Sequence, residues 1–587
     1  MKKTTSQKQT LALLWRFLKG AKRYFLATIL AAGITALADM LQPQIIRAAI
    51  DCALGGKEGG FPAFVMELVD RIGGFSYLGQ HLWIMALAVL LVALVQVISQ
   101  YAFRVFNTKA SETLVKTMRD QLFSHIQHLP FSWHMKNRTG DIIQRCTSDI
   151  DTTKNFLSEQ LTSIFRIALL LVLSITFMCS MHPLLTLIAL IPTPVIILYS
   201  FHFHKKVHDG FEACDESEGK LSAMAQENLT GVRVVRAFGQ ERAEIDKFQK
   251  QNDHYTSLWE KMGKTLSQFW SISDILSGIQ VMLVVIFGAY FCVHSNLHSG
   301  EYIAFISYNS MMVWPIRQLG RMISELSKAG VSIDRVAYIM NSPVEQDEQD
   351  ATDADMNGDI CFEHVNFSYE NSPQILHDIH FTMKAGTTLG ILGGTGSGKS
   401  TLMLLLDKLY PLEEGCGRIT IGGTDIRKIR TAHLRRNIGI ASPVLDMEAI
   451  RAAAQAAALD TSITSFTAGY DTMVGERGVT LSGGQKQRAA IARMLVNDTP
   501  IMIFDDSLSA VDTETDAKIR QAIAKRFGKA SVILISHRIT TLSATDKIIV
   551  LDRGRIAEEG THETLKSAGG IYQKIYEAQS GITEVNP

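Results

Sequence analysis

The sequence TLGILGGTGSGKSTLMLLL, residues 388–406, sets the architecture of the C-terminal half of the chain. A short apolar run, a glycine-rich segment and a second apolar run follow one another, which predicts a strand, a loop and a helix. In the middle, four residues separate Gly393 from Gly398, Lys399 and Ser400, and this is the spacing of a phosphate-binding P-loop. The stretch therefore predicts an α/β domain that binds a nucleotide.

The loop residues have distinct chemical tasks. Glycines let backbone N–H groups turn toward phosphate oxygens, Lys399 reaches the outer phosphates, and the Ser400 hydroxyl ligates Mg²⁺. We expect ATP to be held by Gly393, Gly394, Thr395, Gly396, Ser397, Gly398, Lys399, Ser400 and Thr401. The alternative, a glycine-rich turn with no ligand, does not explain a strand before the loop and a helix after it.

A second stretch, IMIFDDSLSAVD at residues 501–512, supplies two carboxylates. Asp505 ends an apolar strand, so its side chain is expected to lie dry beside the phosphates and to orient Mg²⁺ together with Ser400. Asp506 stands where the residue that polarises the attacking water is expected to be a glutamate. Its side chain is one methylene shorter, and a misplacement of about 1 Å can lower a rate ~10²-fold. The sequence predicts a site that binds ATP better than it cleaves it.

Residues 1–340 are predicted to form a membrane domain. Six stretches each approach the ~20 residues that cross a ~30 Å hydrocarbon layer. One of them, LWIMALAVLLVALVQVI at residues 82–98, lacks the polar stripe of a helix buried in a soluble domain. The expected spans in the lipid bilayer are residues 24–46, 82–106, 161–181, 183–203, 270–293 and 302–323.

The distribution of Lys and Arg predicts the orientation of these spans. Both residue types are frequent before the first span and in the connections near 104–160 and 204–264, whereas the linkers at His182 and at 294–301 have none. By the positive-inside rule, both termini are cytoplasmic. The two long connections are expected to form helical arms of about 25 residues, which at ~1.5 Å per residue reach roughly 35–40 Å below the membrane.

Charge and composition indicate which partners are excluded and where the two domains are joined. Lys+Arg and Asp+Glu both number 58, and no dense basic run is present, so we expect no nucleic-acid partner. An acidic, proline-containing linker at 341–358 separates the membrane domain from a soluble α/β nucleotide-binding domain at 359–587.

A few ionisable residues lie within the predicted spans. Asp39 is expected near the outer interface, paired with a neighbour such as Arg47, although charges at membrane depth are also often functional. Asp274 lies in the fifth span. Arg317 and Arg321, at the end of the sixth, are expected to extend toward cytoplasmic water.

Four motifs together resemble a known family. They are GGTGSGKST at 393–401, LSGGQKQR at 481–488, FDDSLSAVD at 504–512 and ISHR at 535–538. In this order, behind six membrane segments, they resemble a half-transporter of the ATP-binding cassette (ABC) exporter family. The stretches at 131–151 and 227–241 are similar to the loops that press coupling helices onto the nucleotide-binding domains of that family. The resemblance covers nearly the whole chain.

This resemblance implies an ATP site shared by two chains. In the family, two cassettes close head to tail, so each ATP lies between the P-loop of one chain and the LSGGQ motif of the other. Tyr369 would stack on adenine, His537 would contact the γ-phosphate and steady the water, and Asp512 would link the two sites. The donors to the partner's ATP would be Ser482, Gly483, Gly484 and Gln485. An ordinary strand tyrosine and a capping histidine are the alternatives for Tyr369 and His537.

The chain departs from the family pattern twice. Asp506 replaces the glutamate, and Ser442 and Pro443 occupy the place of a glutamine that contacts magnesium. Both changes weaken this chain's own site, whereas LSGGQ, which serves the partner's site, is intact. We therefore predict an ATPase half of a heterodimeric exporter of amphipathic small molecules in a bacterial plasma membrane. The alternatives are a homodimeric exporter with slow hydrolysis and a nucleotide-gated regulator that does not pump.

Overall fold

The chain folds into two compact units, which are described separately. The structure is a computed structural model, and it describes residues 13, 15–56, 61, 63–294, 297–370, 372–438, 447–475, 480–496, 499–505, 515, 519, 521 and 530–584. The membrane unit comprises Met1–Gln127 and Arg138–Ser342, and the nucleotide unit comprises His128–Asn137 and Pro343–Pro587. Residues 128–137 thus group with the nucleotide unit, inside a stretch assigned to the membrane domain from sequence. The predicted domain limits stay a prediction.

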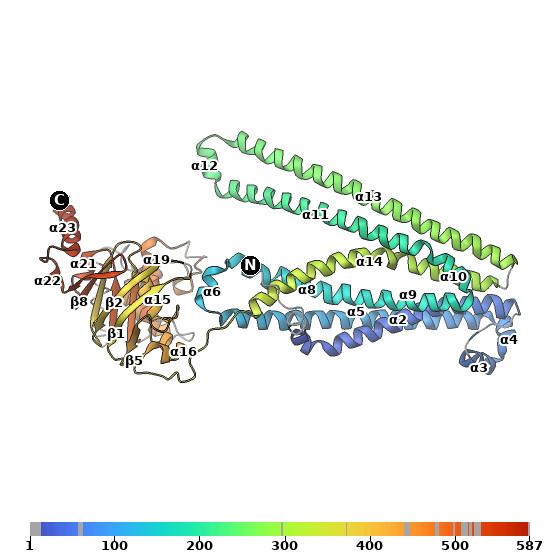
Figure 1. Ribbon diagram of the computed structural model, residues 1–587, viewed down its shortest axis with the longest axis horizontal. Coiled ribbons are helices and arrows are strands. Elements are labelled where there is room, and N and C mark those ends of the chain that lie inside the picture. The colour runs from blue at the N-terminus through green and yellow to red at the C-terminus, as the bar shows by residue number, and fades with distance from the viewer. Residues whose placement is uncertain are drawn as a thin grey trace. The chain divides into compact units, whose positions relative to one another are not determined.

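The described residues of the membrane unit form long helices joined by short ones (Figure 1). The long helices are α2 (Lys22–Ala48), α5 (Leu82–Gln127), α9 (Leu161–Met181), α11 (Pro192–Thr230), α13 (Glu241–His294) and α14 (Ser299–Met340). The short elements are η1 (Leu18–Gly20), η2 (Ala49–Leu54), α3 (Ala63–Ile72), α4 (Gly74–Gln80), α7 (Thr139–Cys146), α8 (Ser148–Asn155), η3 (Phe156–Gln160), α10 (Pro183–Leu190) and α12 (Val232–Ala237). Pro183 and Pro192 stand at helix starts, where the missing N–H has no intrahelical acceptor to lose.

Five segments of the described chain are long and apolar enough to cross a membrane. They are Lys22–Leu54, Leu82–Gln127, Thr139–Met181, Pro183–Thr230 and Glu241–His294. The first five predicted spans fall within these segments, one in each. The sixth, residues 302–323, lies in the continuous helix α14 but is not among the five, so it stays a prediction. The expected helical extensions are confirmed, since α5 continues to Gln127 and α11 and α13 run far beyond their apolar parts.

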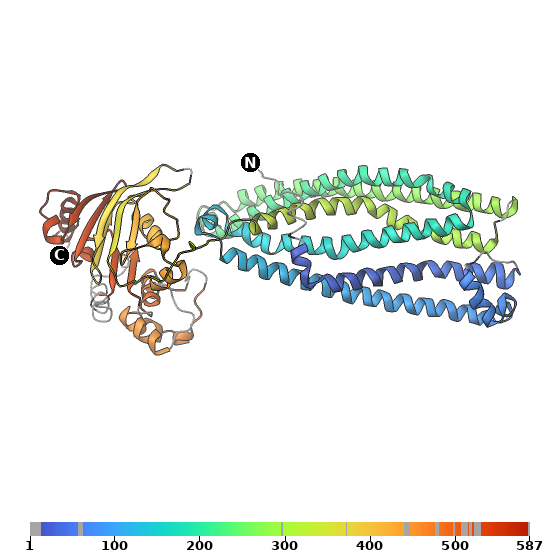
Figure 2. The ribbon, with the colours of Figure 1, turned by 60° about the horizontal axis from the view of Figure 1, so that its bottom comes forward.

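The helices of the membrane unit pack through a small buried core and leave a broad apolar surface. In both views α11 and α13 lie side by side (Figures 1 and 2). Tyr308 is fully buried, and its hydroxyl donates to the carbonyl of Met40 over 2.7 Å, which ties α14 to α2. By contrast, Leu90 and Val97 on α5 are 64% and 62% exposed. Such side chains suit contact with lipid acyl chains, because every backbone polar group behind them is satisfied within the helix.

The nucleotide unit is an α/β fold with two sheets. Its strands are β1 (Ile360–Ser368), β2 (Gln374–Met383), β3 (Thr388–Gly393), β4 (Arg418–Ile421), β5 (Thr424–Asp425), β6 (Ile501–Asp505), β7 (Ser531–Ile535), β8 (Lys547–Asp552) and β9 (Arg555–Gly560). Its helices and 3-10 turns are α6 (Phe131–Lys136), α15 (Lys399–Leu406), η4 (Ile426–Lys428), α16 (Thr431–Asn437), α17 (Met447–Ala456), α18 (Asp460–Thr464), η5 (Gly469–Asp471), α19 (Gly483–Leu495), α21 (Ile539–Leu542), α22 (His562–Leu565) and α23 (Ile571–Glu584). This confirms the predicted fold class, a helical membrane domain joined to an α/β nucleotide-binding domain.

The order of the strands brings the predicted site residues to one edge. One sheet is antiparallel, in the order β2-β1-β4-β5, and the other has the order β6-β7-β3-β8-β9. In the second sheet β6, β7, β3 and β8 are parallel, and β3 is buried from Leu389 to Gly393. Parallel neighbours end at the same edge, which is where ligands bind in sheets of this kind. The P-loop follows β3, Asp505 ends β6 and His537 follows β7.

Candidate functional site

The glycine-rich loop runs from the end of β3 to the first turn of α15. Gly393 closes the strand, Gly394 to Gly398 form the loop, and Lys399 to Thr401 begin the helix. Gly396 and Gly398 have φ angles of 79° and 100°, which L-residues rarely adopt. A Cβ at position 398 would lie 2.5 Å from a side-chain carbon of Leu376. The loop backbone therefore requires glycine here, and it leads into a helix start whose N–H groups favour an anion.

Lys399 is held over this loop. It is buried, and its Nζ donates to the carbonyl oxygens of Gly393 and Gly394, both over 2.7 Å. These bonds keep the ammonium group at the mouth of the loop and prevent the long side chain from swinging into solvent. The backbone of the loop therefore positions Lys399, the residue that is predicted to bind the outer phosphates.

The structure brings together the two predicted magnesium ligands. Ser400 Oγ donates to Asp505 Oδ2 over 3.1 Å, although the residues are far apart in sequence. Mg²⁺ prefers hard oxygen ligands and usually takes only one or two from protein beside substrate phosphates, so this hydroxyl and carboxylate fit the ion. The expectation that Asp505 lies dry is wrong for the single chain, because its side chain is exposed at the end of β6.

Tyr369, the predicted adenine contact, lies in an aromatic cluster. Its hydroxyl is 3.1 Å from Thr401 Oγ1 in the first turn of α15, and the edge of Tyr410 meets its ring with centroids 4.9 Å apart. Phe131 of α6 meets Tyr410 in the same edge-on way at 5.8 Å. A cavity of about 590 Å³ lies between these aromatic rings and α6. Tyr369 is therefore connected both to the P-loop helix and to the short helix α6.

Two features of this cluster were missed from sequence. Tyr410 carries no motif that separates it from an ordinary core aromatic residue. Lys136 of α6 forms an ion pair with Glu370, directly after the predicted adenine contact. The sequence signal for the second feature was the family-like stretch at 131–151, which predicts a contact with the nucleotide domain but not the residue that α6 would reach.

The LSGGQ motif forms the start of helix α19. Ser482 caps this helix: its Oγ accepts from the Gln485 N–H over 3.3 Å, and its own N–H donates to Gln485 Oε1 over 2.9 Å. Gly483 and Gly484 form the first turn, so their N–H groups have no acceptor within the helix. Ser482 and Gly483 are exposed, and their predicted role toward a second chain stays a prediction.

His537 lies two residues after β7, at the carboxyl edge of the parallel strands. Its side chain is exposed, and its backbone carbonyl accepts from Gln579 Nε2 over 2.8 Å, which fixes the main chain at this point. Asp506 and Asp512, and the segment with Ser442 and Pro443, lie outside the described residues.

One carboxyl group near the P-loop helix has unusual electrostatics. Asp407 follows the last residue of α15, and burial raises its pKa to about 6, although the positive charge of Arg435 acts in the opposite direction. Arg435 directs its Nη atoms to Glu345 over 2.8 and 2.7 Å, and only its Nε reaches the backbone carbonyl of Asp407. Asp407 Oδ1 is buried without a hydrogen-bond partner among the described residues.

The charged residues of the membrane unit pair differently from the sequence-based expectation. Asp39 does not pair with Arg47: it accepts from Gln96 over 2.5 Å and lies 3.6 Å from Arg166. The pairing depends on helix packing, because α5 and α9 both lie against α2.

Two further ion pairs correct the remaining expectations. Arg47 instead forms a buried pair with Glu301 at 2.6 Å. Arg317 does not extend into water: its side chain is 9% exposed and it pairs with Asp274 at 2.7 Å. The side chain of Arg321 is outside the described residues.

Comparisons with known proteins cover both units. The family described as ABC transporter transmembrane region matches residues 25–316, and the family described as ABC transporter matches residues 376–509. A probable multidrug resistance ABC transporter ATP-binding/permease protein of Bacillus subtilis (strain 168) is 32% identical, over 97% of this chain and 97% of that protein. An ATP-dependent lipid A-core flippase of Legionella pneumophila (strain Paris) is 30% identical, over 80% of this chain and 83% of the flippase. The structure of a bacterial Atm1-family ABC exporter with ATP bound is similar with a TM-score of 0.76 and 25% identity, over 97% of this chain and 99% of that one.

Proposed function

Since this chain belongs to the ABC transporter family, we propose that it exports amphipathic small molecules as one half of a heterodimer. Family membership makes it an integral membrane protein with an ATPase domain coupled to transport. Half-transporters of this kind act as dimers, so a second half-transporter chain is the expected partner.

The observation that carries the proposal is the contact between Ser400 and Asp505. A hydroxyl from the P-loop helix and a carboxylate from a neighbouring strand end meet at 3.1 Å, beside a lysine folded over the loop. In the proposed site Lys399 binds the outer phosphates of ATP, and Ser400 and Asp505 hold Mg²⁺. Bound Mg²⁺ neutralises the phosphate charge that grows during cleavage. Tyr369 stacks on adenine, and His537 orients the water.

The sequence supports an asymmetric pair of sites. Asp506 directly follows the strand-end Asp505, and its shorter side chain reaches about 1 Å less far than glutamate, a difference that can lower a rate ~10²-fold. LSGGQ is intact and caps a well-formed helix. We infer that this chain's P-loop site cleaves ATP slowly, and that Ser482 to Gln485 complete a faster site on the partner's P-loop.

The nature of the cargo and of the membrane is inferred from three features. The similarity to a probable multidrug resistance protein and to a lipid A-core flippase, both bacterial, supports an amphipathic cargo and a bacterial plasma membrane. The spans are rich in adaptable Met and aromatic side chains, which suit variable apolar ligands. The Lys and Arg distribution supports cytoplasmic termini, so that the cargo leaves the cytoplasm or the inner leaflet.

The test is the composition of the complex together with its ATPase activity. The chain is purified from its native membrane in mild detergent and weighed by native mass spectrometry. We expect the 65.0 kDa chain together with a second chain of different mass. A mass of two identical chains would refute the heterodimer and leave the slow homodimeric exporter.

The ATPase measurement separates a slow site from an inactive protein. Asp506→Glu should raise turnover at this chain's own site, measured with the partner's catalytic glutamate replaced by glutamine. Asp505→Asn is the matched control, because it keeps the side-chain size but removes the charge that holds the metal, and it should abolish that gain. If Asp506→Glu changes nothing, the short aspartate is not the main defect. ATP-driven uptake into sealed inverted vesicles distinguishes an exporter from a regulator that only binds nucleotide.

A further inference from the structure

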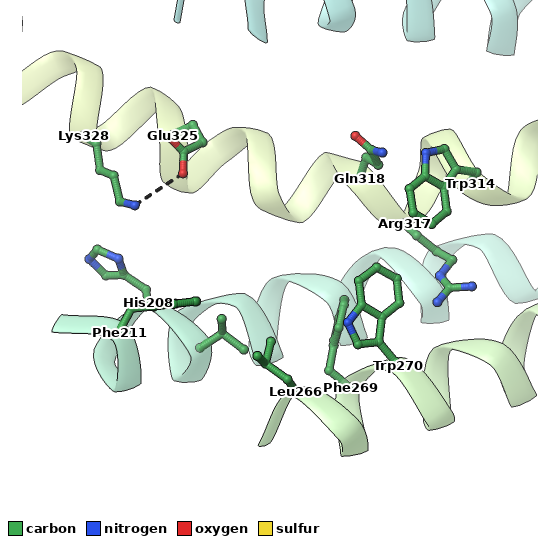
Figure 3. Close-up of a pocket in the computed structure, with 11 residues that line it drawn as sticks. His208, Phe211, Leu266, Phe269, Trp270, Trp314, Arg317, Gln318, Glu325 and Lys328 are labelled. Atoms are coloured by element: carbon green, nitrogen blue, oxygen red, sulfur yellow. Dashed lines mark hydrogen bonds and ion pairs between the residues drawn. The ribbon is translucent and has the colours of Figure 1, made fainter. Parts of the chain in front are cut away.

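A pocket in the membrane unit has the features of a ligand site. It encloses about 310 Å³ between α11, α13 and α14, which is within the range of small-molecule sites (Figure 3). Its apolar wall consists of Val207, Phe211, Leu266, Phe269, Trp270 and Trp314. At helical rise, Trp270 lies about 36 Å from the end of α13 at His294 and Arg317 about 27 Å from the start of α14 at Ser299. With a hydrocarbon layer of ~30 Å, the pocket lies at one boundary of the membrane.

The polar centre of the pocket is Arg317. Its guanidinium carbon lies 5.1 Å from the ring centroid of Trp270 and 6.0 Å from that of Trp314. The two indole rings are nearly parallel, at 12°, with centroids 6.0 Å apart. Figure 3 shows Arg317 extending from α14 toward the indole of Trp270 on α13. Interfacial tryptophans that only anchor a helix face lipid, whereas these two rings face one another beside a cation.

The hydrogen bonding of Arg317 is incomplete. Its side chain is only 9% exposed, and Nη1 donates to Asp274 over 2.7 Å. Its Nε is buried and has no hydrogen-bond partner among the described residues. A buried donor without an acceptor is costly, and more so on a charged group. Arg317 lines the pocket, so an acceptor that enters the pocket lies beside this guanidinium group and can offer it a further hydrogen bond.

The charges around the pocket favour an anion. Among the described lining residues, Arg317 and Lys328 are cationic and Glu325 is anionic, and Lys328 pairs with Glu325 at 3.3 Å. Asp274, the counter-ion of Arg317, does not line the pocket, and its side chain is 69% exposed. An ion pair with so exposed a partner contributes little to stability, so Arg317 can exchange it for another acid. An acidic group can therefore replace Asp274 on Arg317 and find an apolar wall for the rest of the molecule.

From this geometry we infer that the pocket binds an amphiphile with one acidic group, a carboxylate, sulfonate or phosphate, which pairs with Arg317 while its apolar part lies against the two tryptophans. The inference rests on the proposed export function only in making this amphiphile a cargo. Binding itself requires neither ATP nor a partner's catalytic residues. The acid can belong to a membrane lipid or to a small molecule dissolved in the membrane.

The test is a binding titration with two matched probes. The purified complex is placed in phosphatidylcholine nanodiscs without nucleotide and titrated with 11-(dansylamino)undecanoic acid, and separately with the amine of equal chain length. Binding is followed by the increase in dansyl fluorescence. The acid should bind, and the amine should bind at least about 10-fold more weakly, as expected for one charge-assisted hydrogen bond gained or lost. Tighter binding of the amine overturns the inference.

Variants of the pocket have expected effects of opposite sign. Arg317→Ala should weaken acid binding about 10-fold or more, and Trp314→Leu, at an exposed side chain, should weaken it without a risk to folding. Asp274→Asn removes the competing carboxylate and should strengthen acid binding. Arg335→Ala, which removes an arginine from α14 outside the pocket, is the control and should leave binding unchanged. An Arg317→Ala protein that binds the acid like the wild type, or an Asp274→Asn protein that loses binding, overturns the inference.

Two further measurements assign the source of the acid and separate the two proposals. If phosphatidylglycerol added to the nanodiscs competes with the probe, the site recognises the headgroup of a membrane lipid. If it does not, the site recognises the free amphiphile. ATP-driven uptake of the same probe into inverted vesicles tests whether the bound amphiphile is a cargo. Binding without uptake refutes the cargo role and keeps the site, whereas uptake that is unchanged in Arg317→Ala refutes the site and keeps export.

Discussion

Replacing Asp407 by asparagine should stabilise the nucleotide unit at neutral pH. Burial raises the pKa of this carboxyl from 3.8 to about 6, so the folded state holds its proton more tightly than the unfolded state. The stability that comes from the proton is fully present below pH 3.8 and is lost as the pH rises through 6. At pH 7.5 the folded chain must therefore carry a negative charge on Asp407, where burial removes part of its hydration. Asp407→Asn removes that charge.

The size of the effect follows from the shift. About two pKa units correspond to ~3 kcal/mol, at about 1.4 kcal/mol per unit. This is an upper limit, because Asp407 is only partly buried and asparagine loses the attraction of Arg435. We expect ~1–2 kcal/mol at pH 7.5, or a rise in Tm of roughly 2–8 °C for a unit of this size. At pH 5.0 the same linkage leaves about half of the gain.

The assay is thermal unfolding of the full-length protein at pH 7.5 and pH 5.0. The transition of the nucleotide unit is identified by its upward shift when ATP is added. Asp425→Asn is the matched control, since burial alone would raise the pKa of Asp425 but hydrogen bonds from Arg427 and its charge lower it. That substitution should destabilise at neutral pH. A lower Tm for Asp407→Asn at pH 7.5, or a gain of equal size at both pH values, would refute the reasoning.

Three other substitutions test the membrane core and the ATP site. Arg47→Met leaves the buried carboxylate of Glu301 without its 2.6 Å partner and should lower the unfolding free energy by ~3–5 kcal/mol, whereas adding Glu301→Gln should restore part of the Tm. Gly398→Ala places a Cβ 2.5 Å from a leucine of β2 and should weaken binding of a fluorescent ATP analogue at least ~10-fold, while Gly415→Ala, whose Cβ meets nothing within 4 Å, should not. Ser482→Ala removes a helix cap worth ~1 kcal/mol, so the Tm should fall only slightly. A large fall in the ATP turnover of the dimer beside this small fall in Tm would show that the hydroxyl acts on nucleotide. A small fall in both would contradict this.

The features that could be predicted from sequence are those fixed by local patterns. The P-loop, the strand before it and the helix after it follow from glycine spacing and apolar runs, and long apolar stretches predict five of the membrane segments directly. The sequence also predicts that Asp505 lies near Ser400, because Asp505 ends an apolar strand and parallel strands share one carboxyl edge.

The features that could not be predicted depend on which helices pack together. Asp39 pairs with Arg166 on another helix, not with the nearby Arg47, since the partner of a side chain in a bundle is set by tertiary packing. Arg317 has a long charged side chain near the end of a predicted span, which favours extension to water. Its side chain is nevertheless largely buried, because two tryptophans from different helices lie beside its guanidinium group. The spacing of residues within one helix does not show which side chains of other helices will lie beside them.

The exposure of Asp505 links the chemistry of the site to the assembly. A carboxylate that orients a metal acts most strongly where water is excluded, because charges interact far more strongly in a low dielectric. In this chain Asp505, Ser482 and His537 are all exposed, although the sheet edge and helix caps hold their backbones in place. One chain thus presents ordered ligands but not the dry surroundings that they need. A second nucleotide-binding domain packed against this edge would exclude water and supply the LSGGQ donors. Removing the Ser482 hydroxyl should therefore slow ATP cleavage at the partner's P-loop and leave ATP cleavage at the P-loop of the same chain, which contains Ser400, unchanged.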